Sequence, residues 1–187
     1  FLEKLSILLS AQDWFGPSIS REEIELYFKK YYTVFWNNFF KLQIPFLIRW
    51  KTVFGDLETW MIWANIGINQ SDKLEKISKG SIKEINLFGN NENSHYLNNI
   101  RVNEPKQGVN ASSIAEVSGI PRATVGRKLK KLISEKIIKK NSRLEYVLTN
   151  QGKLNEKIET NFLINQKHIA IFVTDIFNLI KKSSLKT

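Results

Sequence analysis

The side chains best suited to specific chemistry in this sequence are arginines and lysines gathered between residues 101 and 143. That stretch holds eleven Lys or Arg and three Asp or Glu residues, a net charge of +8, whereas residues 1–100 are neutral overall. A guanidinium group can donate two parallel hydrogen bonds to a phosphate or to guanine O6 and N7, and an ammonium group neutralises phosphate. The cluster therefore indicates a polyanionic partner, or else a lysine-rich surface that is simply solvated.

Residues for covalent, acid–base or metal chemistry are scarce. The chain has no cysteine, and its two histidines are His95 and His168. Neither histidine has sequence neighbours that would complete a catalytic triad or a metal site, and the sequence contains no glycine-rich phosphate loop. We therefore predict that the protein is not an enzyme and that it needs no cofactor and no metal.

Part of the basic cluster predicts two helices joined by a tight turn. Asn110 or Ser112 can cap the first helix, whose apolar positions are Ile114, Ala115 and Val117. Gly119 follows where a helix must end in a left-handed conformation, and Pro121 suits a helix start because its missing N–H would be unpaired there anyway. The second helix is expected from Arg122 to Lys136, with four residues facing inward: Val125, Leu129, Leu132 and Ile133.

A β-hairpin is predicted directly after these helices. Ile137 and Ile138 form its first strand, residues 139–143 its basic turn, and Leu144 to Thr149 its second strand, with Leu144, Tyr146 and Leu148 on one face. Ser94 to Val102 fits the first helix of a three-helix core. Two helices followed by such a wing are typical of a winged helix-turn-helix, whose second helix enters the DNA major groove.

Ten side chains are predicted to contact double-stranded DNA from the two helices and the wing. Arg122 and Arg127 can each read a guanine, the lysines and Arg143 can neutralise phosphates, and the serines at the helix start can hydrogen-bond a phosphate. The full set is Ser112, Ser113, Arg122, Thr124, Arg127, Lys128, Lys131, Lys139, Lys140 and Arg143.

The run Arg122-Ala123-Thr124-Val125-Gly126-Arg127 resembles the recognition helix of the cyclic-AMP receptor protein family, which carries R-E-T-V-G-R. The following Leu129-Lys-Lys-Leu132 and a wing ending Leu148-Thr149-x-x-Gly152 are similar to winged-helix regulators of the MarR and IclR type. The resemblance covers about residues 92–155. It implies that Arg122 and Arg127 contact bases and that Thr124 contacts a base or a phosphate. Ala123 replaces the glutamate of the receptor family, and residues 1–90 read as helices rather than as a nucleotide-binding jelly roll.

The rest of the chain is predicted to be helical. Ser20 with Glu22 and Glu23 suits a helix start, and that helix is expected to reach about Phe40 before Pro45 interrupts the chain. Further helices are expected at residues 1–10, 46–68 and 151–182. The sequence thus divides into a helical N-terminal dimerisation and possible effector region (1–90), a winged-helix domain (91–150) and a C-terminal dimerisation helix (151–187).

Apolar side chains cover more than one face of the helix at 46–68. One stripe holds Trp50, Val53, Phe54, Leu57, Trp60, Met61, Ala64 and Ile68, while Ile62, Trp63 and Ile66 lie off it. The second face meets either another subunit or the interior of its own domain. We expect a homodimer built from residues 1–70 and 151–182; the alternative is that the tail helix packs on the N-terminal helices. The tryptophans either form core or line a pocket for a small apolar effector: Trp14, Trp36, Trp50, Trp60 and Trp63.

No signal pattern is visible after Phe1, and Thr59–Ser71, the longest uncharged stretch of the apolar middle, falls short of the roughly 20 residues of a membrane span. A cytoplasmic location is expected. The sequence predicts a mainly helical, sequence-specific DNA-binding transcriptional regulator that reads a two-fold operator. The alternative is a winged-helix module that binds protein or RNA without operator specificity.

Overall fold

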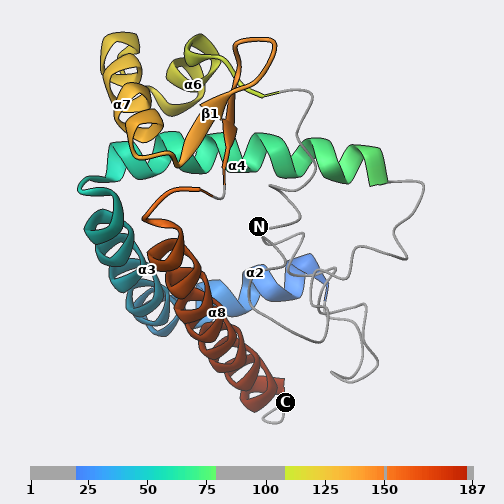
Figure 1. Cartoon of the computed structure of the whole chain (residues 1–187). Coiled ribbons are helices and arrows are strands. Elements are labelled where there is room, and N and C mark those ends of the chain that lie inside the picture. The colour runs from blue at the N-terminus through green and yellow to red at the C-terminus, as the bar shows by residue number, and fades with distance from the viewer. Residues whose placement is uncertain (1–19, 79–107, 150, 185–187) are drawn as a thin grey trace. The chain divides into compact units, whose positions relative to one another are not determined.

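The computed structural model describes residues 20–78, 108–149 and 151–184, and these residues are mainly helical with one two-stranded antiparallel sheet (Figure 1). Contacts divide the chain into a terminal unit, Phe1–Pro45 with Lys167–Thr187, and a central unit, Phe46–Gln166. The mainly helical class, the small hairpin and the long C-terminal helix that the sequence predicts are confirmed. The elements in chain order are α2 (Arg21–Lys30), α3 (Tyr32–Phe54), α4 (Leu57–Ser78), α6 (Ala111–Ser118), α7 (Arg122–Ser134), β1 (Ile138–Lys140), β2 (Tyr146–Leu148) and α8 (Asn155–Ser184).

The helix predicted from Ser20 to about Phe40 begins as expected but ends earlier, at Lys30. Ser20 Oγ accepts the Glu23 N–H at 3.2 Å, and the Glu23 carboxylate accepts the Ser20 N–H at 2.8 Å, a reciprocal cap of α2. The backbone leaves helical geometry at Tyr31, with φ −114° and ψ 33°, so α2 and α3 are separate helices. Pro45 does not interrupt α3, which loses one backbone donor there and continues to Phe54.

The helix predicted at 46–68 is divided between α3 and α4 by a turn at Gly55. Gly55 has φ +85°, a left-handed conformation that side chains disfavour. Asp56 follows and caps α4, because its Oδ1 accepts the Thr59 N–H at 2.7 Å. This turn redirects the chain so that α4 packs against α6, α7 and β2.

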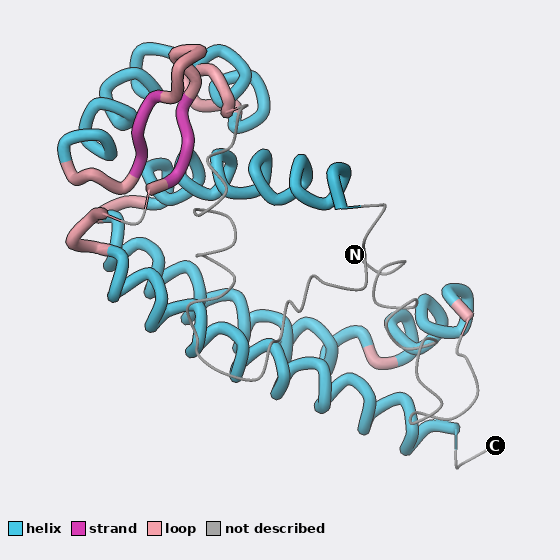
Figure 2. The backbone as a smooth tube through the Cα atoms, turned by 45° about the vertical axis from the view of Figure 1, so that its right-hand side comes forward, coloured by secondary structure: helices cyan, strands magenta, loops and turns pink. Residues whose placement is uncertain are grey.

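α4 contributes buried apolar side chains to the core of the central unit. Ile62, Trp63 and Ile66 are at most 4% exposed, whereas Met61 and Ile68 are 37% and 58% exposed. The second apolar face of this helix is therefore buried inside its own unit. Figures 1 and 2 show α6, α7 and the hairpin on one side of α4. The region that the sequence analysis assigns to an N-terminal domain thus supplies a helix on which the predicted DNA-binding elements rest.

The hairpin is shifted from the prediction: β1 is Ile138–Lys140, so Lys139 and Lys140 lie in a strand rather than in the turn, and β2 is only Tyr146–Leu148. Ile138 pairs with Leu148 and Lys140 with Tyr146, while Leu144 lies in the turn with its side chain 72% exposed rather than in the second strand. Val109 extends the pairing, exchanging backbone hydrogen bonds with Tyr146 at 3.2 and 2.9 Å. The Leu148 N–H donates to the buried Gln70 Oε1 at 2.8 Å, which attaches the hairpin to α4.

In the terminal unit, α8 presents a buried row to α2 and α3. Phe172, Ile176 and Ile180 are each no more than 5% exposed, and aromatic residues of α2 and α3 pack against them: Tyr27, Phe28, Phe35 and Phe39. The long C-terminal helix predicted at 151–182 runs from Asn155 to Ser184. The helices predicted at 1–10 and 94–102 lie outside the described residues. Among the helices that are described, none is long and apolar enough to cross a membrane.

The hydrogen bond from Leu148 to Gln70 gives the first testable prediction. Gln70→Ala should lower the free energy of unfolding by about 1–3 kcal/mol, because it leaves a buried N–H without its acceptor. Urea denaturation measures this loss, and hydrogen exchange should show faster exchange at the Leu148 amide. The matched control is Asn65→Ala on the same helix, where the amide donates only to the Met61 carbonyl at a partly exposed position. Equal losses in both variants would contradict a special role for Gln70.

Candidate nucleic-acid interface

The turn between α6 and α7 forms as the sequence predicts. Asn110 caps α6, since its Oδ1 accepts the Ser113 N–H at 2.9 Å. Gly119 ends the helix with φ +68°, and its N–H donates to the Ala115 carbonyl at 3.0 Å. Ile120 is 7% exposed and anchors the turn in the core, while Pro121 directly precedes α7. These contacts fix the angle at which α7 leaves α6.

α7 has a buried line and an exposed line. The buried residues follow helical spacing: Val125, Lys128, Leu129 and Leu132. Ala123, Arg127 and Lys130 lie on the opposite, exposed line. Between them, the half-exposed Gly126 has no atom within 4 Å of where a Cβ would stand. The exposed line therefore carries two cations, and the small residues Ala123 and Gly126 leave the helix backbone accessible beside them.

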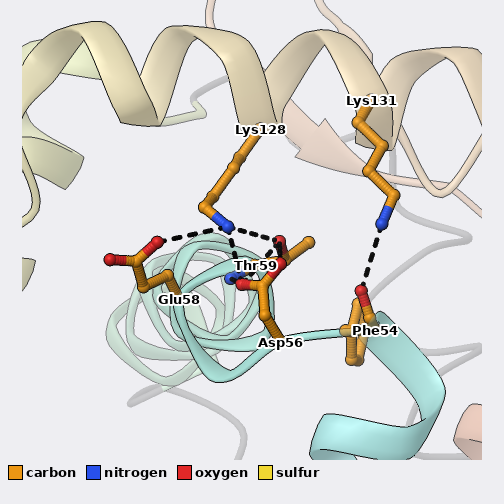
Figure 3. A network of polar contacts seen from close by, with 6 residues as sticks. All are labelled: Phe54, Asp56, Glu58, Thr59, Lys128 and Lys131. Carbon is orange, nitrogen blue, oxygen red and sulfur yellow. Dashed lines mark hydrogen bonds and ion pairs between the residues drawn. The ribbon is translucent and has the colours of Figure 1, made fainter.

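Lys128 is not on the exposed face, which contradicts the prediction that it contacts phosphate. The residue is 9% exposed, and its Nζ lies 2.7 Å from Asp56 Oδ1 and 3.2 Å from Glu58 Oε2 (Figure 3). The same ammonium donates to Thr59 Oγ1 at 3.2 Å. A buried ammonium must be paired, and these three partners at the start of α4 pair it. Lys128 is thus an anchor between α7 and α4.

Lys131 is classed as exposed, but its ammonium group also forms a hydrogen bond within the chain. Its Nζ donates to the Phe54 carbonyl at 3.2 Å, at the C-terminal end of α3 (Figure 3). Cations at a helix C-terminus are favoured by the helix dipole. The outward projection predicted for Arg122 to Lys131 therefore fails at Lys128, and Lys131 contacts the corner between α3 and α4 instead of pointing freely outward.

The carboxylate of Asp56 is stabilised in its charged form by Lys128 and Thr59. Partial burial alone would raise its pKa, but hydrogen bonds from Lys128 and from the N–H and hydroxyl of Thr59 outweigh that effect. Together they lower the pKa of Asp56 from 3.8 to about 2. Thr59 Oγ1 lies 3.0 and 2.9 Å from the two carboxylate oxygens. Asp56 thus both caps α4 and binds α7.

The predicted site residues outside this corner are exposed or partly exposed. Arg122, Arg127 and Ser112 are exposed, while Thr124 and Ser113 are half-buried. On the hairpin, Lys139, Lys140 and Arg143 are exposed, and Lys140 Nζ lies 5.3 Å from the centroid of the Tyr146 ring. Ile133, which was predicted to face inward, is 38% exposed, and Val117, an apolar position of the first helix, is 74% exposed. The elements that carry the three predicted arginines and the hairpin lysines, α7 and the hairpin, lie on one side of α4 (Figures 1 and 2).

Several residues that organise this surface were missed by the sequence analysis. Lys130, on the exposed line, is a cation of the same basic cluster as Arg127 and Lys131 and could have been included with them. Asp56 and Thr59 follow Gly55 in a helix-start pattern that was visible, and Lys128 stands three residues after Val125, within the buried spacing. Gln70 carried no such signal, because its partner Leu148 is 78 residues away.

The tryptophans of the central unit form core rather than an open pocket. Trp50 and Trp63 are 1% and 4% exposed, and their ring centroids are 5.6 Å apart. Trp60 stacks on Trp50 at 6.2 Å, Trp36 contacts aromatic neighbours in the terminal unit, and Trp14 lies outside the described residues. The central unit also has a shallow groove of about 390 Å³, lined by no tryptophan but by Ile48, Arg49, Thr52, Val53, Glu156, Lys157, Thr160 and Asn161.

Nothing in the described part of the chain gathers three His, Cys, Asp or Glu side chains in an arrangement that could hold a metal ion. His95 lies outside that part, and His168 is on α8. Comparison of the chain with models of known protein families, with curated proteins and with solved structures finds no match.

The depressed pKa of Asp56 predicts an acid-labile contribution to stability. The contribution should be complete above about pH 4, the ordinary range for a free aspartate, and should be lost as the pH falls toward about 2, where the folded form takes up its proton. Because 43% of the Asp56 side chain is exposed, we expect about 1 kcal/mol or less after solvent screening. Urea denaturation across this range measures it.

Asp56→Asn supplies the control for this pH dependence. The amide keeps the size of the side chain but cannot titrate, so the variant should be less stable than the wild type at pH 7 and should converge with it in acid. A wild type and variant that lose stability in parallel between pH 4 and 2 would show that the Asp56 contacts do not produce the effect.

Proposed function

We propose that this protein binds double-stranded DNA through α7 and the hairpin of β1 and β2, as a winged helix-turn-helix transcriptional regulator. The observation that carries the proposal is the exposed line of α7. It presents Arg127 and Lys130 beside Ala123 and Gly126, and it is followed in the chain by a hairpin with three exposed cations. A helix of this kind fits the major groove, which is about 12 Å wide and displays a distinct pattern for each base pair.

Arg127 is the residue we assign to base recognition. It is exposed near the middle of α7, and the small residues Ala123 and Gly126 before it leave room for a base edge to approach the helix. Arg122, also exposed, stands at the first position of the helix, where it can reach a base or a phosphate. A bidentate pair from either guanidinium to guanine O6 and N7 is worth about 1–3 kcal/mol of discrimination.

The hairpin cations and the start of α6 supply the contacts that fix register. Lys139, Lys140 and Arg143 are exposed on the hairpin, and Ser112 is exposed in the first turn of α6. The lysine and serine contacts go to phosphates, carry no sequence information and make affinity fall steeply with salt, while Arg143 can reach a phosphate or the minor groove. Lys128 is left out of this set because its charge is matched by Asp56 and Glu58.

We further propose that the protein is a homodimer, so that two copies read two half-sites of a two-fold operator. Support comes from apolar side chains left exposed on α3 of the terminal unit: Tyr32 at 63%, Phe40 at 46% and Ile44 at 53%. They recur at multiples of four residues and so lie along neighbouring positions of one helix surface. Exposed apolar surface of this kind marks protein contacts.

Arg127→Ala tests the base-reading role. With duplexes enriched from a random library, the variant should lose about tenfold or more in preference for the enriched sequence over a scrambled one. Fluorescence anisotropy at several salt concentrations measures both preference and salt dependence. The control is Lys51→Ala, which removes one exposed cation from α3 and should leave the preference unchanged. Unchanged preference in Arg127→Ala would refute the assignment; equal binding of duplex RNA would favour an RNA-binding module.

Ile44→Glu tests the dimer. A charge placed in an apolar contact between copies should weaken self-association at least about tenfold, which sedimentation velocity over a concentration series would detect. The control is Glu22→Gln, which replaces an exposed carboxylate in the first turn of α2 and should sediment like the wild type. A wild type that sediments as a monomer at micromolar concentration, or that binds a single half-site as tightly as a two-fold site, would contradict the dimer.

A further inference from the structure

An apolar side chain lies at the tip of the basic hairpin. Leu144 is 72% exposed and has φ +60°, the left-handed conformation that leucine disfavours. Arg143 precedes it and is also exposed. Hairpin turns of this shape normally place glycine or asparagine at the left-handed position. Leu144 is therefore unfavourable in two respects, its backbone conformation and its exposure to water.

Hydrogen bonds around Asn141 hold the tip in this conformation. Asn141 Oδ1 accepts the N–H groups of Arg143 and Glu145, each at 2.9 Å, and the Leu144 N–H donates to the Asn141 carbonyl at 3.0 Å. The Asn141 N–H donates to the Glu145 carbonyl at 2.9 Å, and its side-chain amide donates to the Glu145 carboxylate at 3.2 Å. The turn therefore keeps Leu144 pointing outward rather than letting it fold back on the hairpin.

Packing against the hydrophobic cores of the described residues does not offset the exposure of Leu144. Leu144 is not among the residues of either hydrophobic core, although Tyr146 and Leu148 on the same hairpin are. Local rules that are broken without an internal compensation are expected at functional sites. The same hairpin indicates the kind of partner, because it exposes three cations, Lys139, Lys140 and Arg143, which favour a polyanion over an apolar protein or a lipid core.

We infer that Leu144 is an apolar wedge that enters the DNA minor groove, with Arg143 beside it. The inference rests on the proposed function, and it adds a second contact of a different kind to that of α7. The hairpin lies on the same side of α4 as α7 (Figures 1 and 2), so a duplex held by α7 presents its neighbouring minor groove to the tip. Apolar side chains placed between base steps partly unstack them and bend the duplex, and arginine is the usual companion in a narrow minor groove.

Leu144→Gly and Leu144→Asn separate the wedge from a structural role. Both residues accept the left-handed conformation, so both variants should melt a few degrees higher than the wild type. Both should nevertheless bind an enriched duplex roughly tenfold more weakly, because an apolar contact is lost. Leu144→Met keeps an apolar side chain and should retain most of the affinity. Ser142→Ala at the same tip is the matched control and should bind like the wild type.

Fluorescence energy transfer between the ends of the duplex should report a bend that is present with the wild type and Leu144→Met and reduced with Leu144→Asn. Exchanging guanine for inosine in the flanking segment tests the groove. This change removes the minor-groove amino group and leaves the major-groove pattern intact. It should strengthen wild-type binding and have a smaller effect on Leu144→Asn.

The outcomes distinguish this inference from the function on which it rests. If the wild type shows no preference for duplex DNA over another polyanion, the proposed function fails and the wedge fails with it. If the wild type binds DNA and depends on Arg127, but Leu144→Asn binds and bends DNA like the wild type, the wedge alone is overturned. Equal sensitivity of wild type and Leu144→Asn to inosine would also overturn it, since the contact would then lie elsewhere.

Discussion

The orientation of α7 depends on one buried ammonium group. Lys128 Nζ lies between the carboxylates of Asp56 and Glu58 with about a tenth of its side chain exposed, and an unpaired charge in that position would be strongly unfavourable. Successive residues of a helix are rotated by about 100°, so a shift of one position would move Lys128 out of the corner and bring an arginine or a leucine toward the carboxylates. The same rotation would turn Arg127 and Lys130 away from the exposed face. The ion pair thus specifies which residues of α7 are exposed.

Asp56 connects this orientation to the path of the backbone. Its carboxylate accepts the Thr59 N–H that caps α4 and also pairs with Lys128, so the start of α4 and the rotation of α7 share one group. Lys131 adds a hydrogen bond to the Phe54 carbonyl on the other side of Gly55. The cations of α7 and the hairpin consequently fall into two groups, those bound within the chain and those left exposed. Lys128 and Lys131 bind groups between the end of α3 and the start of α4, and the other cations remain exposed on α7 and the hairpin.

The elements that could be predicted from sequence are those set by local chemistry. Asn110 as a cap and Gly119 as a left-handed helix end act over a few residues, and both form as expected. The contacts that attach α7 and the hairpin to α4 join groups 72 and 78 residues apart, so spacing within a window could not reveal them. Lys128 shows the consequence: its residue type favoured an exposed, DNA-facing role, but its position in the apolar spacing of α7 placed it inside.

Two positions in this region depart from local expectation, and the difference between them is informative. Lys128 puts a charge in an apolar stripe, and three partners within the chain compensate it. Leu144 puts an apolar side chain at an exposed left-handed turn position, and the hydrophobic cores of the described residues do not include it. A departure that is compensated inside the molecule serves the fold. One that is held outward by the hydrogen bonds of Asn141, among exposed cations, has its compensation in a partner.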